Sequence, residues 1–536
     1  MMLTQIIIKY YHRRRVMKKN VTKTCILLIM LFVAATVFAQ TAGDYRTRAS
    51  GDWSMAQNWE RYNGASWGAI GTPPTGAETI TVLEADSIFV NVGVSITGTL
   101  VNQGIVESNY TLTIADGGTY QHDRDAGKVP IANWEEGSNM LITGVTTTAP
   151  EDRDQDYYNM TFNTPGLLSN LNMNLDENTI GGDIRVVETG YARWYLTSAL
   201  AMDTSIVTIM GDVVVENGAF SVQGTSNALT TFIVHHYGNI EVTGGNFSVS
   251  RGSQAAGTTT WYIYEGDFSM ANATTQSSTV TPSGAKFVFM KDGTQKFTLG
   301  EGNTFTALPV EVSSGTTLDM GPSKLAGNGV FILNEGATMM TSLAGGVAEV
   351  LSGVAAEVTL QDGSSYGFNS TVSQVTSNRM PAIVTDLIID NPSGVALTQE
   401  TTINGMLRLV SGEFDNTIPF TLGPNGSVSY EGGSLKLAVA VEEGDQVIPE
   451  TFSVDQNYPN PFNPSTTIGF TLPVASDVSV KVYNVSGQEI DMLYEGRMRA
   501  GKHKLSFDAK NLGTGLYFYR VQAGNLVEMR QMVLIK

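Results

Sequence analysis

The sequence predicts an all-β protein in which a parallel β-helix is followed by an immunoglobulin-like β-sandwich. Charged residues make up only 15% of the 536 residues, and the chain contains 56 glycines. A Gly-Asx motif recurs at nearly constant spacing, and the last part of the chain holds alternating strands separated by glycine turns. Low charge, many tight turns and a fixed repeat are typical of β-solenoids.

The leader, residues 1–39, has the order of a secretory signal peptide. A basic stretch precedes an apolar run from Cys25 to Phe38, and Ala39 follows before Gln40. This run is shorter than the ~20 apolar residues that span a bilayer, so a membrane anchor is not predicted. We predict cleavage between Ala39 and Gln40 and no transmembrane segment in the mature protein.

The charge is distributed unevenly along the chain. Residues 1–39 contain seven of the 32 basic residues and no acid, which leaves 25 basic and 51 acidic residues and a net charge of −26. Nine basic and eight acidic residues lie from residue 450 onward, so nearly all the negative charge lies in 40–449. Such a surface repels phosphates, and nucleic acid is not expected as a partner. The only cysteine lies in the leader, so no disulfide framework is predicted.

Residues 40–437 are predicted to form the solenoid, with rungs of about 28 residues. A Gly-Asx-apolar motif recurs there at spacings of 29, 27 and 28, and its copies start at Gly182, Gly211, Gly238 and Gly266. A second pattern places a glycine after an alternating strand and a two-residue turn, at Gly117, Gly315, Gly336 and Gly363. Glycine there would supply the positive φ of a bend. A string of small antiparallel sandwiches is the alternative, because the spacing is irregular after residue 300.

The repeated acids are the first candidates for chemistry. Stacked rungs would align Asp183, Asp212, Asn239 and Asp267 about 4.8 Å apart. Carboxylates at that spacing would repel one another unless a cation bound between them. Each of these residues follows glycine at a bend, where Asp and Asn commonly bind the local backbone. We therefore predict a structural role for the row.

The few histidines do not complete a recognisable site. His235 and His236 are adjacent on a predicted strand, so their side chains should point to opposite faces. His122 lies near Asp123 and Asp125, but no spaced partner completes a metal site. No catalytic, cofactor-binding or metal-binding residue is predicted.

Two further stretches have a functional and a structural interpretation. The acidic stretch 152–156 is followed by Tyr157 where a calcium loop needs glycine, so calcium binding is not favoured. Trp53, Trp59 and Trp67 could stack on a sugar, or could cover the open end of a repeating structure. We favour the cap, because the ends of a solenoid need large side chains to close the core.

The C-terminal region begins with a proline-rich lead-in after a predicted linker at 438–449. Its residues are Tyr458, Pro459, Asn460, Pro461, Phe462, Asn463 and Pro464. Proline lacks the backbone donor that a helix or central strand needs, so the stretch predicts a rigid extended segment. About seven short alternating strands with glycine turns in 450–536 predict the sandwich.

With this lead-in, residues 450–536 resemble the C-terminal sorting domain (type A) of substrates of the type IX secretion system of Bacteroidetes-like bacteria. The resemblance also rests on Val482–Gln488, Gly515–Arg520 and the closing Met532–Lys536. It implies passage through the periplasm, recognition by the type IX machinery at the outer membrane, and a final place outside the cell or on its surface. The region Gly118–Gly144 resembles uncharacterised secreted β-repeat proteins of such bacteria.

We therefore expect a secreted or cell-surface β-repeat protein without a catalytic site, acting in structure, adhesion or glycan contact. Surface glycans are candidate partners, and no cofactor is expected. The alternative is a polysaccharide lyase or glycoside hydrolase on a β-helix scaffold, which would need carboxylates facing one cleft.

Overall fold

The computed structural model describes residues 40–536, apart from 198–203, 225–229, 252–257, 276–283, 301–308, 328, 355–356, 437–450, 475 and 499–500. The predicted signal peptide, including Ala39 of its cleavage site, and the predicted linker at 438–449 lie outside the described residues.

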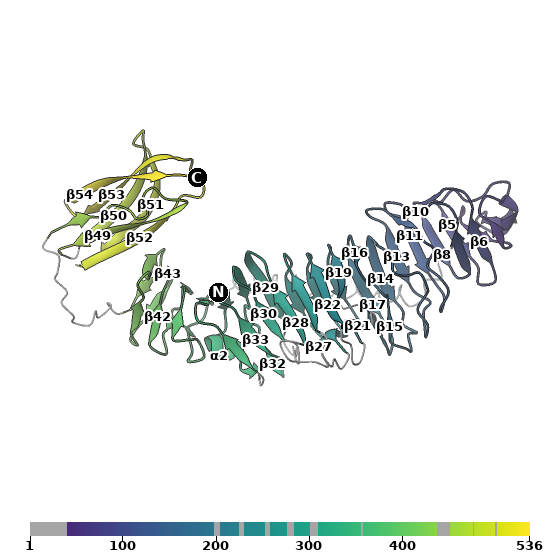
Figure 1. Ribbon diagram of the computed structural model, residues 1–536, viewed down its shortest axis with the longest axis horizontal. Coiled ribbons are helices and arrows are strands. Elements are labelled where there is room, and N and C mark those ends of the chain that lie inside the picture. Colours follow the sequence, from purple (N-terminus) through teal and green to yellow (C-terminus); the bar gives the residue numbers. More distant parts are fainter. Residues whose placement is uncertain are drawn as a thin grey trace, which may run out of the picture.

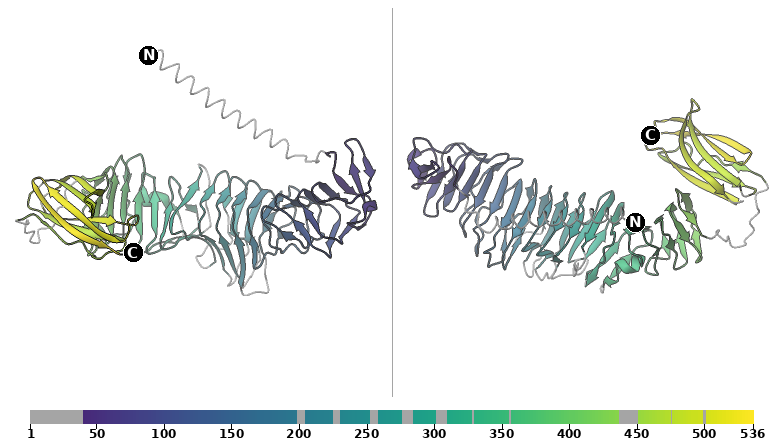
Figure 2. Two further views of the ribbon diagram at one scale, coloured as in Figure 1. Left: turned by 90° about the horizontal axis from the view of Figure 1, so that it is seen from above. Right: turned by 180° about the vertical axis from the view of Figure 1, so that it is seen from behind.

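Residues 79–435 form a parallel β-solenoid, an elongated stack of rungs in all three views (Figures 1 and 2). One face is a continuous sheet in which each strand pairs in parallel with the strand of the next rung. Its strands are β5 (Thr79–Val82), β8 (Thr99–Asn102), β11 (Thr119–His122), β13 (Asn139–Ile142), β14 (Asn159–Asn163), β17 (Ile184–Glu188), β20 (Val213–Val215), β23 (Ile240–Val242), β26 (Phe268–Met270), β29 (Gly293–Leu299), β31 (Thr316–Asp319), β34 (Thr338–Thr341), β37 (Ser365–Phe368), β40 (Leu387–Asp390), β43 (Met406–Ser411) and β46 (Ser427–Tyr430).

Two shorter sheets form the other faces of the middle rungs. The eight-stranded sheet contains β16 (Asn178–Ile180), β19 (Thr204–Ile209), β22 (Thr231–His236), β25 (Thr259–Ile263), β28 (Ala285–Phe289), β30 (Val310–Val312), β33 (Phe331–Leu333) and β36 (Val358–Leu360). The five-stranded sheet contains β15 (Leu171–Asn172), β18 (Arg193–Tyr195), β21 (Ala219–Gln223), β24 (Asn246–Ser250) and β27 (Thr274–Thr275).

Small parallel sheets take the same places at the two ends of the solenoid. At the N-terminal end these are β2 (Gly51–Asp52), β6 (Ser87–Val90) and β9 (Ile105–Ser108), and β7 (Val94–Ile96), β10 (Leu112–Ile114) and β12 (Asn133–Trp134). Toward the C-terminal end they are β32 (Ala326–Gly327) and β35 (Gly353–Val354), then β38 (Gln374–Val375), β41 (Val395–Ala396), β44 (Glu413–Asp415) and β47 (Ser434–Leu435), and β39 (Ile383–Val384), β42 (Thr401–Ile403) and β45 (Phe420–Leu422). A short helix, α2 (Gly346–Val350), interrupts one rung.

Three N-terminal strands, which include an antiparallel hairpin, extend the long sheet beyond β5. Strand β1 (Tyr45–Thr47) pairs in parallel with β5 and antiparallel with β3 (Trp59–Tyr62), which pairs with β4 (Trp67–Ala69). A single 3-10 turn, η1 (Ala56–Asn58), leads into β3. The hairpin therefore covers the first parallel rung.

The rungs differ in length. In the N-terminal part, the residues that pair from one rung to the next are Thr79, Thr99, Thr119, Asn139 and Asn159. In the middle, the paired residues are Ile184, Val213, Ile240, Phe268 and Phe297, which lie farther apart in the sequence. Near the other end Leu387 pairs with Leu407, so the spacing is short again. The predicted rung length therefore describes the middle of the solenoid, and shorter rungs flank it.

Alternation along most strands places one set of side chains in a continuous core. The residues that face inward are almost fully buried, whereas their neighbours along the strand are partly exposed. Aromatic rings stack between rungs, as Phe268 and Phe297 do with centroids 5.0 Å apart. The core continues from Tyr45 to Phe420.

Residues 453–534 form two antiparallel sheets around a second core. The three-stranded sheet contains β48 (Ser453–Val454), β49 (Ser465–Leu472) and β52 (Gly501–Asp508), and the four-stranded sheet contains β50 (Ser476–Asn484), β51 (Glu489–Met498), β53 (Gly515–Ala523) and β54 (Leu526–Leu534). The predicted fold class, a parallel solenoid followed by a small sandwich, is confirmed, and the alternative of serial antiparallel sandwiches for the passenger is wrong.

The two glycine patterns have different physical causes. The glycines after two-residue turns have positive φ, as predicted: Gly117 at 73°, Gly315 at 83°, Gly336 at 74° and Gly363 at 87°. The glycines of the Gly-Asx motif instead lie against the rung before them. A Cβ on Gly238 would stand 2.1 Å from the carbonyl oxygen of Gly211, and a Cβ on Gly266 would stand 1.7 Å from that of Gly238.

Replacing Gly238 with alanine should therefore push two rungs apart. Overpacking of this kind costs about 1–3 kcal/mol, so we expect Gly238→Ala to lower the urea midpoint of the solenoid. Tryptophan fluorescence reports this midpoint selectively, because all six tryptophans lie between Trp53 and Trp261. Gly68→Ala is the control, since a Cβ there would meet nothing within 4 Å. Equal midpoints for the two variants would contradict the close-approach argument.

Candidate functional site

A ladder of Asx side chains joins successive rungs at one corner of the solenoid. This Asx row consists of Asn159, Asp183, Asp212, Asn239 and Asp267. In each case Oδ1 accepts a hydrogen bond from a backbone N–H one rung later. The donors, in the order of the row, are the N–H groups of Asp183 (3.0 Å), Asp212 (2.8 Å), Asn239 (2.7 Å), Asp267 (2.9 Å) and Lys296 (2.8 Å).

The predicted structural role of these residues is correct, but the expected partner was the local backbone and the actual partner is the next rung. The in-register stack explains the difference, because it brings the backbone N–H of the next rung within hydrogen-bond distance of each Oδ1. A carboxylate and a carboxamide serve equally well, since each offers an acceptor oxygen. The row is therefore committed to holding rungs together.

The Asx row gives a direct test with two substitutions. Asp212→Ala removes the acceptor for Asn239 N–H, and we expect a loss of about 1 kcal/mol in the free energy of unfolding. Asp212→Asn keeps the acceptor and should retain the parent urea midpoint, because Asn239 already performs the same task one rung later. A large loss in Asp212→Asn would show that the charge itself is needed, as a cation row would require.

The buried histidines are neutral members of the core. His122 Nε2 lies 2.8 Å from Ala126 O and its Nδ1 lies 3.3 Å from the Tyr120 hydroxyl. His236 Nε2 lies 2.8 Å from Gly211 O. Burial lowers the pKa of each imidazole to about 4. His235 points to the other face of its strand, as predicted.

The carboxylates near His122 are occupied by the backbone or by neighbouring polar groups. Burial opposes the charge of Asp125, but N–H donors of Thr148, Thr147 and Thr146 outweigh it and hold the pKa of Asp125 well below its usual value. Asp123 accepts hydrogen bonds from Thr143 and Gln103. Within the described residues, no group of three or more His, Cys, Asp or Glu side chains is placed to hold a metal ion.

These histidines make stability depend on pH. Their pKa is about 4 in the folded protein and about 6.5 when unfolded, so the unfolded chain binds more protons between those values. The free energy of unfolding should therefore fall as pH drops through this window, by up to about 1.4 kcal/mol per pH unit for each histidine. Urea midpoints at about pH 7 and about pH 4.5 measure the loss. The double variant His122→Gln/His236→Gln should show a flatter dependence, and an unchanged slope would refute this origin.

The acidic stretch 152–156 is bound to neighbouring rungs. Lys128 Nζ lies 3.3 Å from Glu151 and 3.6 Å from Asp152. Asp156 Oδ1 accepts the backbone N–H of Thr179 at 2.8 Å. These contacts make the stretch a surface connection between rungs, in which Asp152 and Asp156 bind different partners.

The N-terminal tryptophans differ in accessibility. Trp53 and Trp59 are buried with centroids 5.0 Å apart, and Trp59 Nε1 donates to Trp53 O at 2.9 Å. The cap interpretation is confirmed for these two, because no ring face remains for a sugar. Trp67 is half-buried under the guanidinium of Arg46, which lies 4.4 Å from its ring centroid.

A partly exposed aromatic cluster lies on the outer side of β22 and β25. Tyr237 and Tyr264 stack with centroids 5.0 Å apart, and His235 stacks on Tyr262 at 5.9 Å. His235 Nδ1 lies 2.9 Å from the Tyr264 hydroxyl, and Tyr237 is 38% exposed. Sequence reasoning missed this cluster, although alternation in Tyr262-Ile263-Tyr264 places both tyrosines on one outer face.

The described surface includes two shallow depressions of interest. One, of about 410 Å³, is lined by Asp116, Glu135, Glu136, Gly137 and Tyr158. The other, of about 360 Å³, has Arg193 and Arg251 in its lining and lies on the five-stranded sheet. No pattern in the sequence distinguished either depression.

The proline lead-in is fixed to the sandwich by one buried side chain. Phe462 is buried and packs on Phe507, with ring centroids 6.1 Å apart. Its backbone N–H donates to Val533 O at 2.9 Å and its carbonyl accepts from Ile535 at 3.0 Å. Asn460 Oδ1 accepts the N–H of Val533 at 2.9 Å. The segment is thereby bound along the last strand, β54.

The opposite side of the lead-in faces solvent. Tyr458 is 81% exposed, and Pro459, Pro461 and Asn463 are exposed beside it. The peptide bonds before Pro459 and Pro461 are cis. Buried Asn457, next to the lead-in, donates to Pro459 O at 3.1 Å and to Thr466 Oγ1 at 2.9 Å. The lead-in thus combines a fixed inner side with an accessible outer side.

Residues 456–536 match the family model described as the secretion system C-terminal sorting domain. This segment is a type IX sorting domain. The protein is therefore a secreted or surface-attached substrate of type IX secretion with a β-helix passenger. No curated protein and no solved structure matches the chain. Among the described residues, no helix is long and apolar enough to cross a membrane.

Proposed function

We propose that the passenger is a non-catalytic rod, displayed on the cell surface or released, that acts in structure, adhesion or glycan contact. The observation that carries this proposal is the bonding of the Asx row. Those acids are the aligned carboxylates that a β-helix enzyme could draw upon, and each one accepts a backbone N–H from the next rung. A carboxylate held in that way is positioned to join rungs rather than to exchange protons with a substrate.

Glycan contact is supported by the outer faces of the middle rungs. The cluster of His235, Tyr237, Tyr262 and Tyr264 offers phenol hydroxyls and ring edges to solvent. Aromatic side chains with a polar group suit contact with sugars, which present both apolar ring faces and hydroxyls. The rings stack on one another, so a sugar would contact the edge of the cluster and its end faces.

The competing function is cleavage of a polysaccharide. Glycoside hydrolysis needs two carboxyl groups about 5–9.5 Å apart across the scissile bond. The purified mature protein should release no reducing or unsaturated sugar ends from a panel of neutral and acidic polysaccharides. Release that disappears with a single Asp or Glu substitution would overturn the non-catalytic proposal.

Export through the type IX machinery should depend on residues 456–536. A chain that ends at residue 436 keeps the solenoid but lacks the sorting domain, and we expect it to accumulate in the periplasm. Cell fractionation with an antibody against the passenger measures this. The full chain carrying Gly68→Ala, a substitution with free space around it, should reach the outside like the parent. Normal surface display of the truncated chain would contradict the role of the sorting domain.

A further inference from the structure

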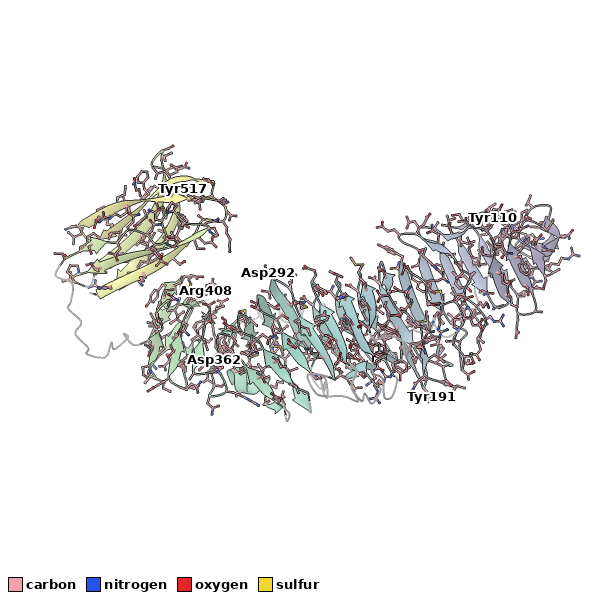
Figure 3. The ribbon with its side chains drawn as sticks, viewed as in Figure 1. Tyr110, Tyr191, Asp292, Asp362, Arg408 and Tyr517 are labelled. Carbon is pink, nitrogen blue, oxygen red and sulfur yellow. The ribbon has the colours of Figure 1, made fainter. Side chains whose placement is uncertain are left out.

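The depression on the five-stranded sheet is unusual in this acidic protein because arginines line it. Its volume is about 360 Å³, and its lining includes Asn170, Tyr191, Arg193, Tyr195 and Arg251. Tyr191 lies at the edge of the rod beside the middle rungs (Figure 3). Residues 40–536 have a net charge of −26, so two guanidinium groups beside one depression are opposite in sign to most of the charge on the protein.

The guanidinium of Arg193 is held in one position by three rungs. Arg193 starts β18 and is only 8% exposed. Its Nη1 donates to Phe220 O in β21 at 2.9 Å, and its Nη2 donates to Asn246 Oδ1 in β24 at 2.5 Å. A group fixed in this way loses little conformational entropy when it binds a ligand.

Arg193 carries a buried charge without an acidic partner. The two acceptors that its guanidinium binds are neutral, and no carboxylate among the described residues forms an ion pair with it. Burial, partly offset by Tyr195 and reinforced by Arg251, lowers the pKa of Arg193 to about 10, so the group stays charged at neutral pH. A buried charge is costly unless it is paired. A neutral amide could donate to the same two acceptors, so these bonds do not explain why a charged group is buried here. An anionic ligand would.

Two tyrosines give the depression aromatic walls. Tyr191 is 96% exposed at the rim. The ring of Tyr195 lies over Gly224, where an added Cβ would stand 2.2 Å from the ring. Tyr195 lines the depression together with Arg193 and Arg251, which places all three groups around the same space. Ring faces and hydroxyls beside a cation suit a sugar that carries an acid.

We propose that this depression binds the carboxylate of a uronic acid residue at or near the end of an acidic glycan. The free edge of the Arg193 guanidinium would take the two carboxylate oxygens, because a planar fork of donors matches a planar pair of acceptors. Arg251 adds positive charge, and Tyr191 covers the sugar ring from the rim. This inference rests on the proposed glycan contact and assigns it a ligand class and a site.

Calorimetric titration of the mature protein tests the proposal with short probes. Trigalacturonate should bind, and its fully methyl-esterified form, which lacks the charges but keeps the sugar rings, should bind at least about tenfold more weakly. Arg193→Gln should weaken trigalacturonate binding by at least about tenfold, and Tyr191→Ala by several-fold. Arg185→Gln is the control, because Arg185 is an exposed arginine on β17 paired with Glu216.

The outcomes separate this site from the broader proposal. Trigalacturonate binding that survives Arg193→Gln, or equal binding of the methyl ester, would overturn the site. Tighter binding of a sulfated trisaccharide than of trigalacturonate would overturn the choice of a carboxylate. Binding of neutral oligosaccharides that is lost in Tyr264→Ala but not in Arg193→Gln would sustain glycan contact while refuting this inference. Tryptophan fluorescence in urea checks that Arg193→Gln remains folded.

Discussion

Parallel stacking of rungs in register is the constraint on which the rest of the solenoid depends. Neighbouring parallel strands lie ~4.8 Å apart, so each corner residue stands directly over its counterpart in the next rung. At a tight corner the stacked backbones approach until only glycine fits, as at Gly238 over Gly211. At this corner the backbone N–H of each Asx residue is bound by an Asx oxygen from the rung before, and a hydrogen bond of this kind contributes about 0.5–1.5 kcal/mol.

This constraint explains which parts of the fold the sequence reveals. Corners accept few residue types, so the length of the middle rungs can be read from the spacing of the corner glycines, Gly182, Gly211, Gly238 and Gly266. Inward positions need only an apolar side chain of suitable volume, so the shorter rungs of the N-terminal part carry no repeated motif in their core. The period of these shorter rungs is carried instead by the polar row of Thr79, Thr99 and Thr119. Threonine is so common in β proteins that this spacing does not stand out as a repeat.

The candidate sites were less predictable because they depend on what lies several rungs away. From the sequence, Trp53 and Trp59 could either stack on a sugar or close the core. Their burial in the structure shows that they close the core. Arg193 at the start of a strand is indistinguishable in sequence from an exposed arginine. Its burial follows from acceptors at Phe220 and Asn246, which lie one and two rungs further along the chain. Arg193 meets these two acceptors only because the rung length stacks the three strands in register.

The net charge of residues 40–536 restricts what the depression beside Arg193 can bind. At a distance, a surface of net charge −26 repels any polyanion, and salt screens that repulsion beyond roughly 8 Å at physiological ionic strength. Within the depression, the fixed guanidinium acts at contact distance, where screening is weak. A long acidic polymer would bring many charges against the acidic rod, whereas a single terminal uronate brings one charge to the one place that attracts it. The same rod that repels acidic polymers along its length would thus select their ends.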